Sequence, residues 1–167
     1  MGYEMWRKES SFRIRKENFG KALAAVKKLA GKETIKDAGG RHFRWVHTPD
    51  FLKAQHIADA FLAWRWKLSF EFGGRDGDVN GLSFEGEKLG DDLKLFKAIA
   101  RFVEPDSYIH MVGEDSEQWR WVFEGKTCTE RRAEVVFPSP AKPSKPVPVK
   151  KAKAKRMKKE PPHFVEL

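Results

Sequence analysis

Cysteine is almost absent from this chain of 167 residues, whose one thiol is Cys128. A single cysteine excludes an intrachain disulfide framework and fits a reducing compartment. The chain also lacks an apolar run near the roughly 20 residues that cross a bilayer, and its start has no signal-peptide pattern. Proline is scarce before residue 138, where only Pro49 and Pro105 occur. We therefore expect a soluble, cytoplasmic protein without membrane contact, with one ordinary domain over residues 1–137.

Motifs of catalysis and nucleotide binding are missing as well. The chain has no Gly-x-Ser-x-Gly elbow, no His-Glu-x-x-His pair and no phosphate-binding loop. The five histidines lack the spacing of metal ligands: His42, His47, His56, His110 and His163. The acid pairs Asp91-Asp92 and Glu114-Asp115 are more simply a helix cap and a turn. The sequence thus predicts neither a catalytic site nor a cofactor. A metal-dependent enzyme that uses Glu114, Asp115 and the acids at 76 and 78 stays a minor alternative.

Hydrophobic periodicity divides residues 1–137 into strands and helices. Apolar residues alternate with polar ones at 3–7, 11–15, 41–46, 67–72 and 82–87. Further strands are expected at 108–112 and 118–123, and a last strand is expected to reach 136–137. Helical spacing holds at 19–30, at 51–62 after the start signal Thr48-Pro49-Asp50, and from Asp91 to about residue 103. This order predicts an α+β sandwich, ferredoxin-like or related. About three helices would pack on one face of a mainly antiparallel sheet.

The segment 76–87 matches the written EF-hand pattern. Four side chains would supply the calcium oxygens: Asp76, Asp78, Asn80 and Glu87. An EF-hand also needs a helix on each side, but this segment follows Gly73-Gly74 and its second half alternates like a strand. Because Asp-Gly and Asn-Gly also favour tight turns, the sequence indicates a hairpin tip, and calcium binding is the weaker hypothesis.

Aromatic and basic residues alternate at several places in the expected strands. If the aromatic residues face the helices, four arginines share the open face of the sheet: Arg13, Arg15, Arg44 and Arg120. Such a face could meet nucleic-acid phosphates or an acidic protein. The alternative is cross-strand pairing with glutamates at 71, 85, 87, 117 and 134. The charge of residues 1–137, which is 9 − 7 = +2, favours this pairing.

The last thirty residues, 138–167, differ from the rest in composition. They hold eight lysines and one arginine against two acids, 9 − 2 = +7, and seven of the nine prolines. We expect a disordered tail in three parts: an extended proline-rich spacer (138–148), a basic segment (149–160) and an apolar end (161–167). The basic residues expected to contact nucleic acid or another anionic surface are Lys150, Lys151, Lys153, Lys155, Arg156, Lys158 and Lys159. Phe164, Val165 and Leu167 form a candidate docking motif. A tail that only increases solubility is the alternative.

The pattern Gly113-Glu114-Asp115, then Trp119-Arg120-Trp121-Val122-Phe123, resembles small uncharacterised proteins of phages, prophages and mobile elements. The resemblance spans roughly residues 80–126 and extends to the start Met1-Gly2-Tyr3. It implies a small α+β domain in a bacterial host cell, with accessory work such as binding host or phage machinery or blocking a defence system. It assigns no catalytic residue, and the basic tail departs from the usual short form. We therefore expect a non-enzymatic binding module, with a protein-directed inhibitor or adaptor as the alternative.

Overall fold

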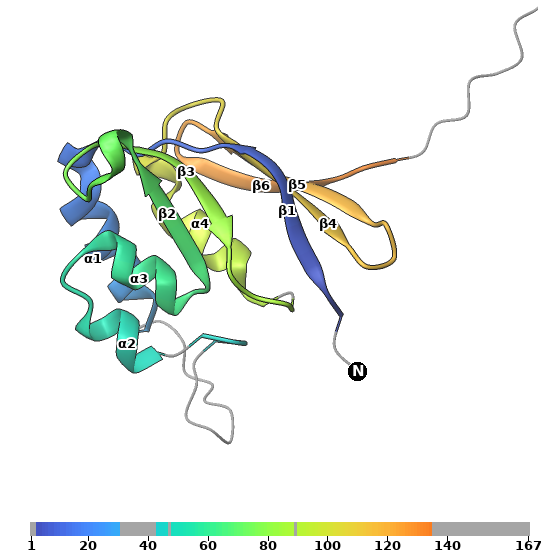
Figure 1. The fold of residues 1–167 in the computed structure, drawn as a ribbon, viewed down its shortest axis with the longest axis horizontal. Coiled ribbons are helices and arrows are strands. Elements are labelled where there is room, and N and C mark those ends of the chain that lie inside the picture. The colour runs from blue at the N-terminus through green and yellow to red at the C-terminus, as the bar shows by residue number, and fades with distance from the viewer. Residues whose placement is uncertain (1–2, 31–42, 47, 89, 135–167) are drawn as a thin grey trace, which may run out of the picture. The chain divides into compact units, whose positions relative to one another are not determined.

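The protein has an α+β fold built on two antiparallel sheets, which confirms the fold class expected from the sequence (Figure 1). The computed structural model describes residues 3–30, 43–46, 48–88 and 90–134. A four-stranded sheet has the order β1-β4-β5-β6, with β1 Met5–Ser11, β4 Tyr108–Gly113, β5 Gln118–Glu124 and β6 Thr127–Arg132. A second sheet pairs β2 (Trp66–Phe70) with β3 (Val79–Phe84). The expected strand end at 136–137 lies outside the described residues.

Four α-helices are present in the described residues: α1 (Phe19–Ala30), α2 (Thr48–Lys53), α3 (Ile57–Ala63) and α4 (Asp92–Ile99). In Figure 1, α1, α2 and α3 lie together on one side of the β2–β3 hairpin, with the four-stranded sheet on the other side. Helix α1 packs against both α3 and α4. None of the described helices is long and apolar enough to span a membrane.

Aromatic side chains form the centre of the core between α4 and the sheets. The alternation of β5 turns Trp119, Trp121 and Phe123 inward, and the ring of Trp121 lies 4.9 Å from that of Phe96 on α4. The Phe96 ring also lies 5.1 Å from Trp66, which joins the two sheets to the same cluster. Burial of each such side chain stabilises the fold by about 1.5–3 kcal/mol before entropy is counted. These contacts explain why the period-two pattern of β5 specifies its inward face.

A buried ion pair connects the start of β2 to the start of α4. The fully buried carboxylate of Asp92 accepts hydrogen bonds from Arg65 Nη2 at 3.0 and 3.1 Å and from the indole N–H of Trp66 at 2.9 Å. The backbone N–H of Gly90 also donates to it at 3.0 Å. Burial raises the pKa of Asp92, while Arg65 and the other donors pull that pKa down. The pair fixes the N-terminus of α4 against the hairpin.

Three local expectations are wrong. The segment 11–15 alternates as expected, with Phe12 and Ile14 buried, but β1 ends at Ser11, and Ile14 forms only isolated bridges to Val79 and Val103. Residues 43–46 form a turn rather than a strand. Trp45 has a left-handed φ of 59° and is half exposed, with Lys88 Nζ 4.7 Å from its ring centre.

The third difference is a break in the helix expected over 51–62. It divides into α2 and α3, and the intervening His56 accepts the N–H of Ala58 on its ring nitrogen as an N-cap. A side-chain cap can start a new helix wherever it meets a free N–H. An apolar stripe with helical spacing can therefore run across a break between two helices and does not reveal it. The helix starts at Thr48 and near Asp91 are confirmed.

Candidate anion-binding groove

A groove of about 770 Å³ runs between α1 and α4, and basic side chains form its rim. Lys21 and Lys28 stand seven residues apart on α1, which is two helical turns, so both lie on the same face. The spacing of Lys94, Lys97 and Arg101 on and just after α4 has the same effect. The packing of α1 against α4 brings the two rows together. The remaining lining residues are Ala24, Ala25, Leu29, Ala98 and Phe102.

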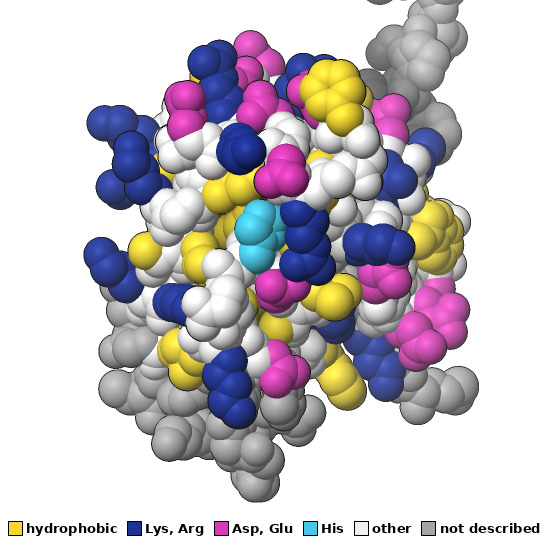
Figure 2. Space-filling model, turned by 60° about the vertical axis from the view of Figure 1, so that its left-hand side comes forward, with side chains coloured by type: hydrophobic (Ala, Val, Ile, Leu, Met, Phe, Trp, Pro, Cys, Tyr) yellow, Lys and Arg dark blue, Asp and Glu magenta, His cyan; other side chains and the backbone are white. Residues whose placement is uncertain are grey.

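The electrostatic character of the groove is positive without compensation. Among the residues that the structure describes, no acidic side chain lines it. Within the described part of the chain, Lys21, Lys28, Lys97 and Arg101 take part in no ion pair, whereas Lys94 pairs with Asp91 at 3.8 Å. Unpaired cations on two facing rows attract an anion to the space between them. On the face that Figure 2 shows, basic side chains lie along the left-hand margin, and basic and acidic side chains are mixed over the rest.

Cys128, the one thiol, is 2 % exposed on β6. Burial raises the pKa of its thiol to about 12, and the nearby charge of Lys97 lowers that pKa only in part. A thiol with so high a pKa is not a nucleophile near neutral pH.

The outer face of the four-stranded sheet is also rich in arginine, but its charges are paired. Arg120 on β5 lies 2.6 Å from Glu9 on β1, and its guanidinium stacks 4.9 Å from the ring centre of Tyr108. Arg131 pairs with Glu124 on this face, and Arg132, which lies opposite the inward-facing Trp119, pairs with Glu117. A hydrogen bond with His110 lowers the pKa of Glu9, and the charge of Arg120 lowers it further. A hollow of about 510 Å³ on this face therefore has little free charge to offer an anion.

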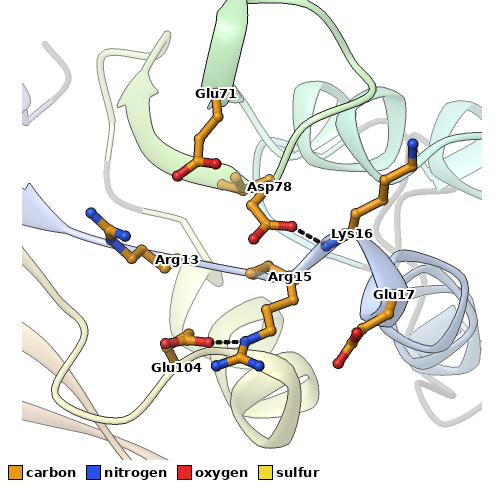
Figure 3. A pocket seen from close by; sticks show the side chains of 9 residues that line it. Arg13, Arg15, Lys16, Glu17, Glu71, Asp78 and Glu104 are labelled. Atoms are coloured by element: carbon orange, nitrogen blue, oxygen red, sulfur yellow. Dashed lines mark hydrogen bonds and ion pairs between the residues drawn. The ribbon is translucent and has the colours of Figure 1, made fainter.

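The structure does not bring the four expected arginines onto one sheet face. Arg13 and Arg15 line a separate cleft of about 710 Å³, in which Arg15 pairs with Glu104 (Figure 3). Arg44 lies in the turn before α2, where its backbone N–H donates to Asp91 at 2.8 Å. Of the four expected arginines, Arg120 is the one that lies in a strand of the four-stranded sheet. The alternative of pairing with glutamates holds for Arg15 and Arg120, although the partners are Glu104 and Glu9 rather than the acids expected.

The EF-hand-like segment is the tip and second strand of the β2–β3 hairpin, as the hairpin interpretation predicted. The carboxylate of Asp78 accepts the backbone N–H of Lys16 at 2.7 Å, and Asp76 lies 3.7 Å from Lys16 Nζ. Asn80 lies within β3, and the backbone carbonyl of Glu87 accepts the N–H of Met5 at 2.8 Å. In the described ranges, no three His, Cys, Asp or Glu side chains cluster closely enough to hold a metal ion.

Other expected site residues have structural places or lie outside the described residues. Glu114 and Asp115 form the turn between β4 and β5, as expected. The basic segment at 149–160 and the docking motif Phe164, Val165 and Leu167 lie outside the described residues, as do His42, His47 and His163. Sequence reasoning missed the groove. The lysine spacing on each helix was visible, but the contact of α1 with α4, some seventy residues later, was not.

No family model, no curated protein and no solved structure matches this chain.

Proposed function

We propose that this chain is a non-enzymatic nucleic-acid-binding module that contacts phosphates through the α1–α4 groove and through the basic segment of its tail. The observation that carries the proposal is the groove rim, where, among the described residues, five basic side chains and no acid line the space between two helices. Lysine dominates the rim, and lysine acts as a point charge without the bidentate geometry that reads bases. Binding is therefore expected to depend on phosphate charge rather than on base sequence.

The tail supports the same proposal from composition. It adds seven basic residues between 150 and 159 to the four unpaired cations of the groove. Each phosphate contact contributes a salt slope of about 0.9 for duplex DNA and about 0.7 for single strands. Four groove contacts thus correspond to a slope near 3, and the tail adds to it. The role in a phage or mobile element that the resemblance implies remains part of the proposal.

The second candidate is the protein-directed inhibitor or adaptor. It is favoured by the apolar floor of the groove, where three alanines lie beside Leu29 and Phe102. A floor of this kind beneath a basic rim also fits an acidic amphipathic helix. Phosphate backbones need no such floor, so the two candidates differ in what the floor contributes.

Fluorescence anisotropy with a labelled oligonucleotide and the full chain tests the first candidate. The variant Lys21→Gln/Lys28→Gln/Lys97→Gln/Arg101→Gln should weaken binding and reduce the salt slope by about 3. The matched control is Arg15→Gln/Arg120→Gln/Arg131→Gln/Arg132→Gln, which removes the same net charge from arginines that are already paired. Equal losses in the two variants would show that net charge alone matters and would overturn the assignment of the groove.

Removal of residues 138–167 measures the share of the tail in the same assay. The proposal expects the truncated chain to keep groove-dependent binding with a smaller salt slope. Unchanged affinity and slope would leave the tail only a solubilising role. A peptide of polyglutamate that competes as well as the oligonucleotide would favour the protein-directed candidate.

A further inference from the structure

The loop between β2 and β3, residues 71–78, is held in place by neighbours on three sides. The N–H of Glu71 donates to the carbonyl of Asp78 at 2.9 Å and closes the loop. Arg75 pairs with Asp59 on α3 at 2.7 Å. The carboxylate of Asp78 holds the segment before α1 through the N–H of Lys16, as the dashed line in Figure 3 shows. These contacts tie the loop to α3 and to the segment before α1.

The 71–78 loop presents an aromatic side chain to solvent. Phe72 is 99 % exposed, more than any other large hydrophobic residue in the described part of the chain. Its backbone has a φ of 60°, in the left-handed region that bulky residues rarely adopt. A strained and fully exposed aromatic on a fixed loop stabilises nothing in its own molecule. Such residues are typical of anchors that fill a pocket on a partner.

The charge of the loop indicates the kind of pocket. Residues 71–78 contain three acids, Glu71, Asp76 and Asp78, and one cation, Arg75, so the loop carries 1 − 3 = −2. The side chain of Glu71 has no hydrogen bond or ion pair within the described ranges, and that of Asp76 is fully exposed apart from Lys16. A complementary pocket has an apolar floor and a basic rim. The α1–α4 groove has both.

We propose that the 71–78 loop of one copy docks into the α1–α4 groove of a second copy. Phe72 packs against the floor formed by Leu29, Phe102 and the alanines, while Asp76 faces the rim of lysines and arginine. Because the loop and the groove are different surfaces, the contact is heterologous. Two copies either exchange loops reciprocally in a closed dimer or continue in a chain. Self-association then occupies the surface of the proposed function, and nucleic acid competes with it, although the contact itself needs no nucleic acid.

Sedimentation velocity of the full chain over a concentration series at low and high salt tests this inference. The wild-type protein is expected to associate reversibly, and salt should weaken the association. Phe72→Ala should raise the dissociation constant about thirtyfold, as for a central aromatic anchor. Trp45→Ala is the control, since Trp45 is also an exposed aromatic with a left-handed φ but lies outside the loop.

A mixing experiment separates direct docking from misfolding. Phe72→Ala keeps an intact groove, and Lys97→Gln/Arg101→Gln keeps an intact loop. Each variant alone should stay monomeric, while an equimolar mixture should form a heterodimer through its one remaining loop–groove contact. Wild-type protein that stays monomeric at every concentration, association unchanged by Phe72→Ala, or a mixture without heterodimer would each overturn the inference.

Sedimentation velocity with added oligonucleotide distinguishes the loop–groove contact from nucleic-acid binding. Added oligonucleotide should dissociate the self-associated protein and form a protein–nucleic-acid complex instead. Self-association with no oligonucleotide binding would leave the loop contact standing and refute the proposed function. Oligonucleotide binding to a strictly monomeric protein would do the reverse.

Discussion

The four-stranded sheet and the α1–α4 groove both carry several basic residues but differ in what those residues meet. On the sheet, Arg120, Arg131 and Arg132 each lie against a glutamate. In the groove, four of the five cations have no acidic partner in the described part of the chain. The small net charge of residues 1–137 therefore conceals a local positive field in the groove. Pairing, not the number of cations, decides where an anion can bind.

The largest expected effect comes from a third kind of charged group, the buried pair of Arg65 and Asp92. Asp92→Ala leaves Arg65 and the indole N–H of Trp66 without their acceptor, and removing one partner of a buried pair costs about 3–5 kcal/mol. We expect a corresponding loss in the free energy of unfolding, measured by denaturant titration. Asp91→Ala, whose side chain is only half-buried, is the control and should cost clearly less. Equal losses would mean that burial does not distinguish these pairs.

A carboxylate introduced into the groove should pair its lysines, as the glutamates pair the arginines of the sheet. Ala24 is an exposed lining residue between Lys21 and Lys28 on α1. Ala24→Glu places a carboxylate three residues after one lysine and four before the other, which stabilises a helix by about 0.2–0.5 kcal/mol per pair. The groove should then lose about tenfold in oligonucleotide affinity while the protein becomes no less stable. Ala24→Gln has the same size without the charge and should keep its affinity, so a loss there would point to a steric cause.

The raised pKa of the buried Cys128 thiol predicts a loss of stability at alkaline pH. Because burial raises the pKa of Cys128 from 9.0 to about 12, the folded state resists forming the thiolate that the unfolded state forms readily. The stability from this group is fully present below pH 9 and is lost as pH rises from 9 towards 12. Cys128→Ala should therefore show a smaller alkaline loss of stability than the wild type. Denaturant titrations of the two proteins at neutral and at alkaline pH measure this difference, and equal alkaline losses would contradict it.

The smallest expected effect is the converse change on the sheet. Glu9→Gln frees Arg120 and His110 from their shared acid. Exposed ion pairs contribute about 0–1 kcal/mol, so the thermal unfolding midpoint should hardly move. Oligonucleotide affinity should rise a fewfold, because a newly unpaired arginine joins the binding surface. A large loss of stability would show that the paired sheet face is structural rather than merely neutral.

The sequence predicted those features that depend on local pattern. The stripe of Phe19, Ala22 and Val26 is buried as expected, and the alternation of β5 places its tryptophans in the core. Features that depend on side-chain capping or on contacts between distant elements were not predictable. His56 divides one expected helix into two, and the 43–46 segment turns where its alternation suggested a strand.

The candidate site belongs to the second kind. Lys21 and Lys28 looked like ordinary solvated lysines on an amphipathic helix, and the tail appeared to hold the free basic charge. Only the packing of α1 against α4 places them opposite Lys97 and Arg101. Similarly, the acids at 76 and 78 have the spacing of calcium ligands, but the fold uses them to hold Lys16.

The pairing of β1 with β4 sets the order in which this protein can fold during synthesis. Met5 pairs with Gly113, a separation of 113 − 5 = 108 residues, whereas β4, β5 and β6 form a continuous meander joined by short turns. Local hairpins close faster than pairings across long loops. Of the described strands, β1 is synthesised first and is thus expected to be the last to join its sheet, and until β5 is made the Phe12 ring lacks its contact with Phe123.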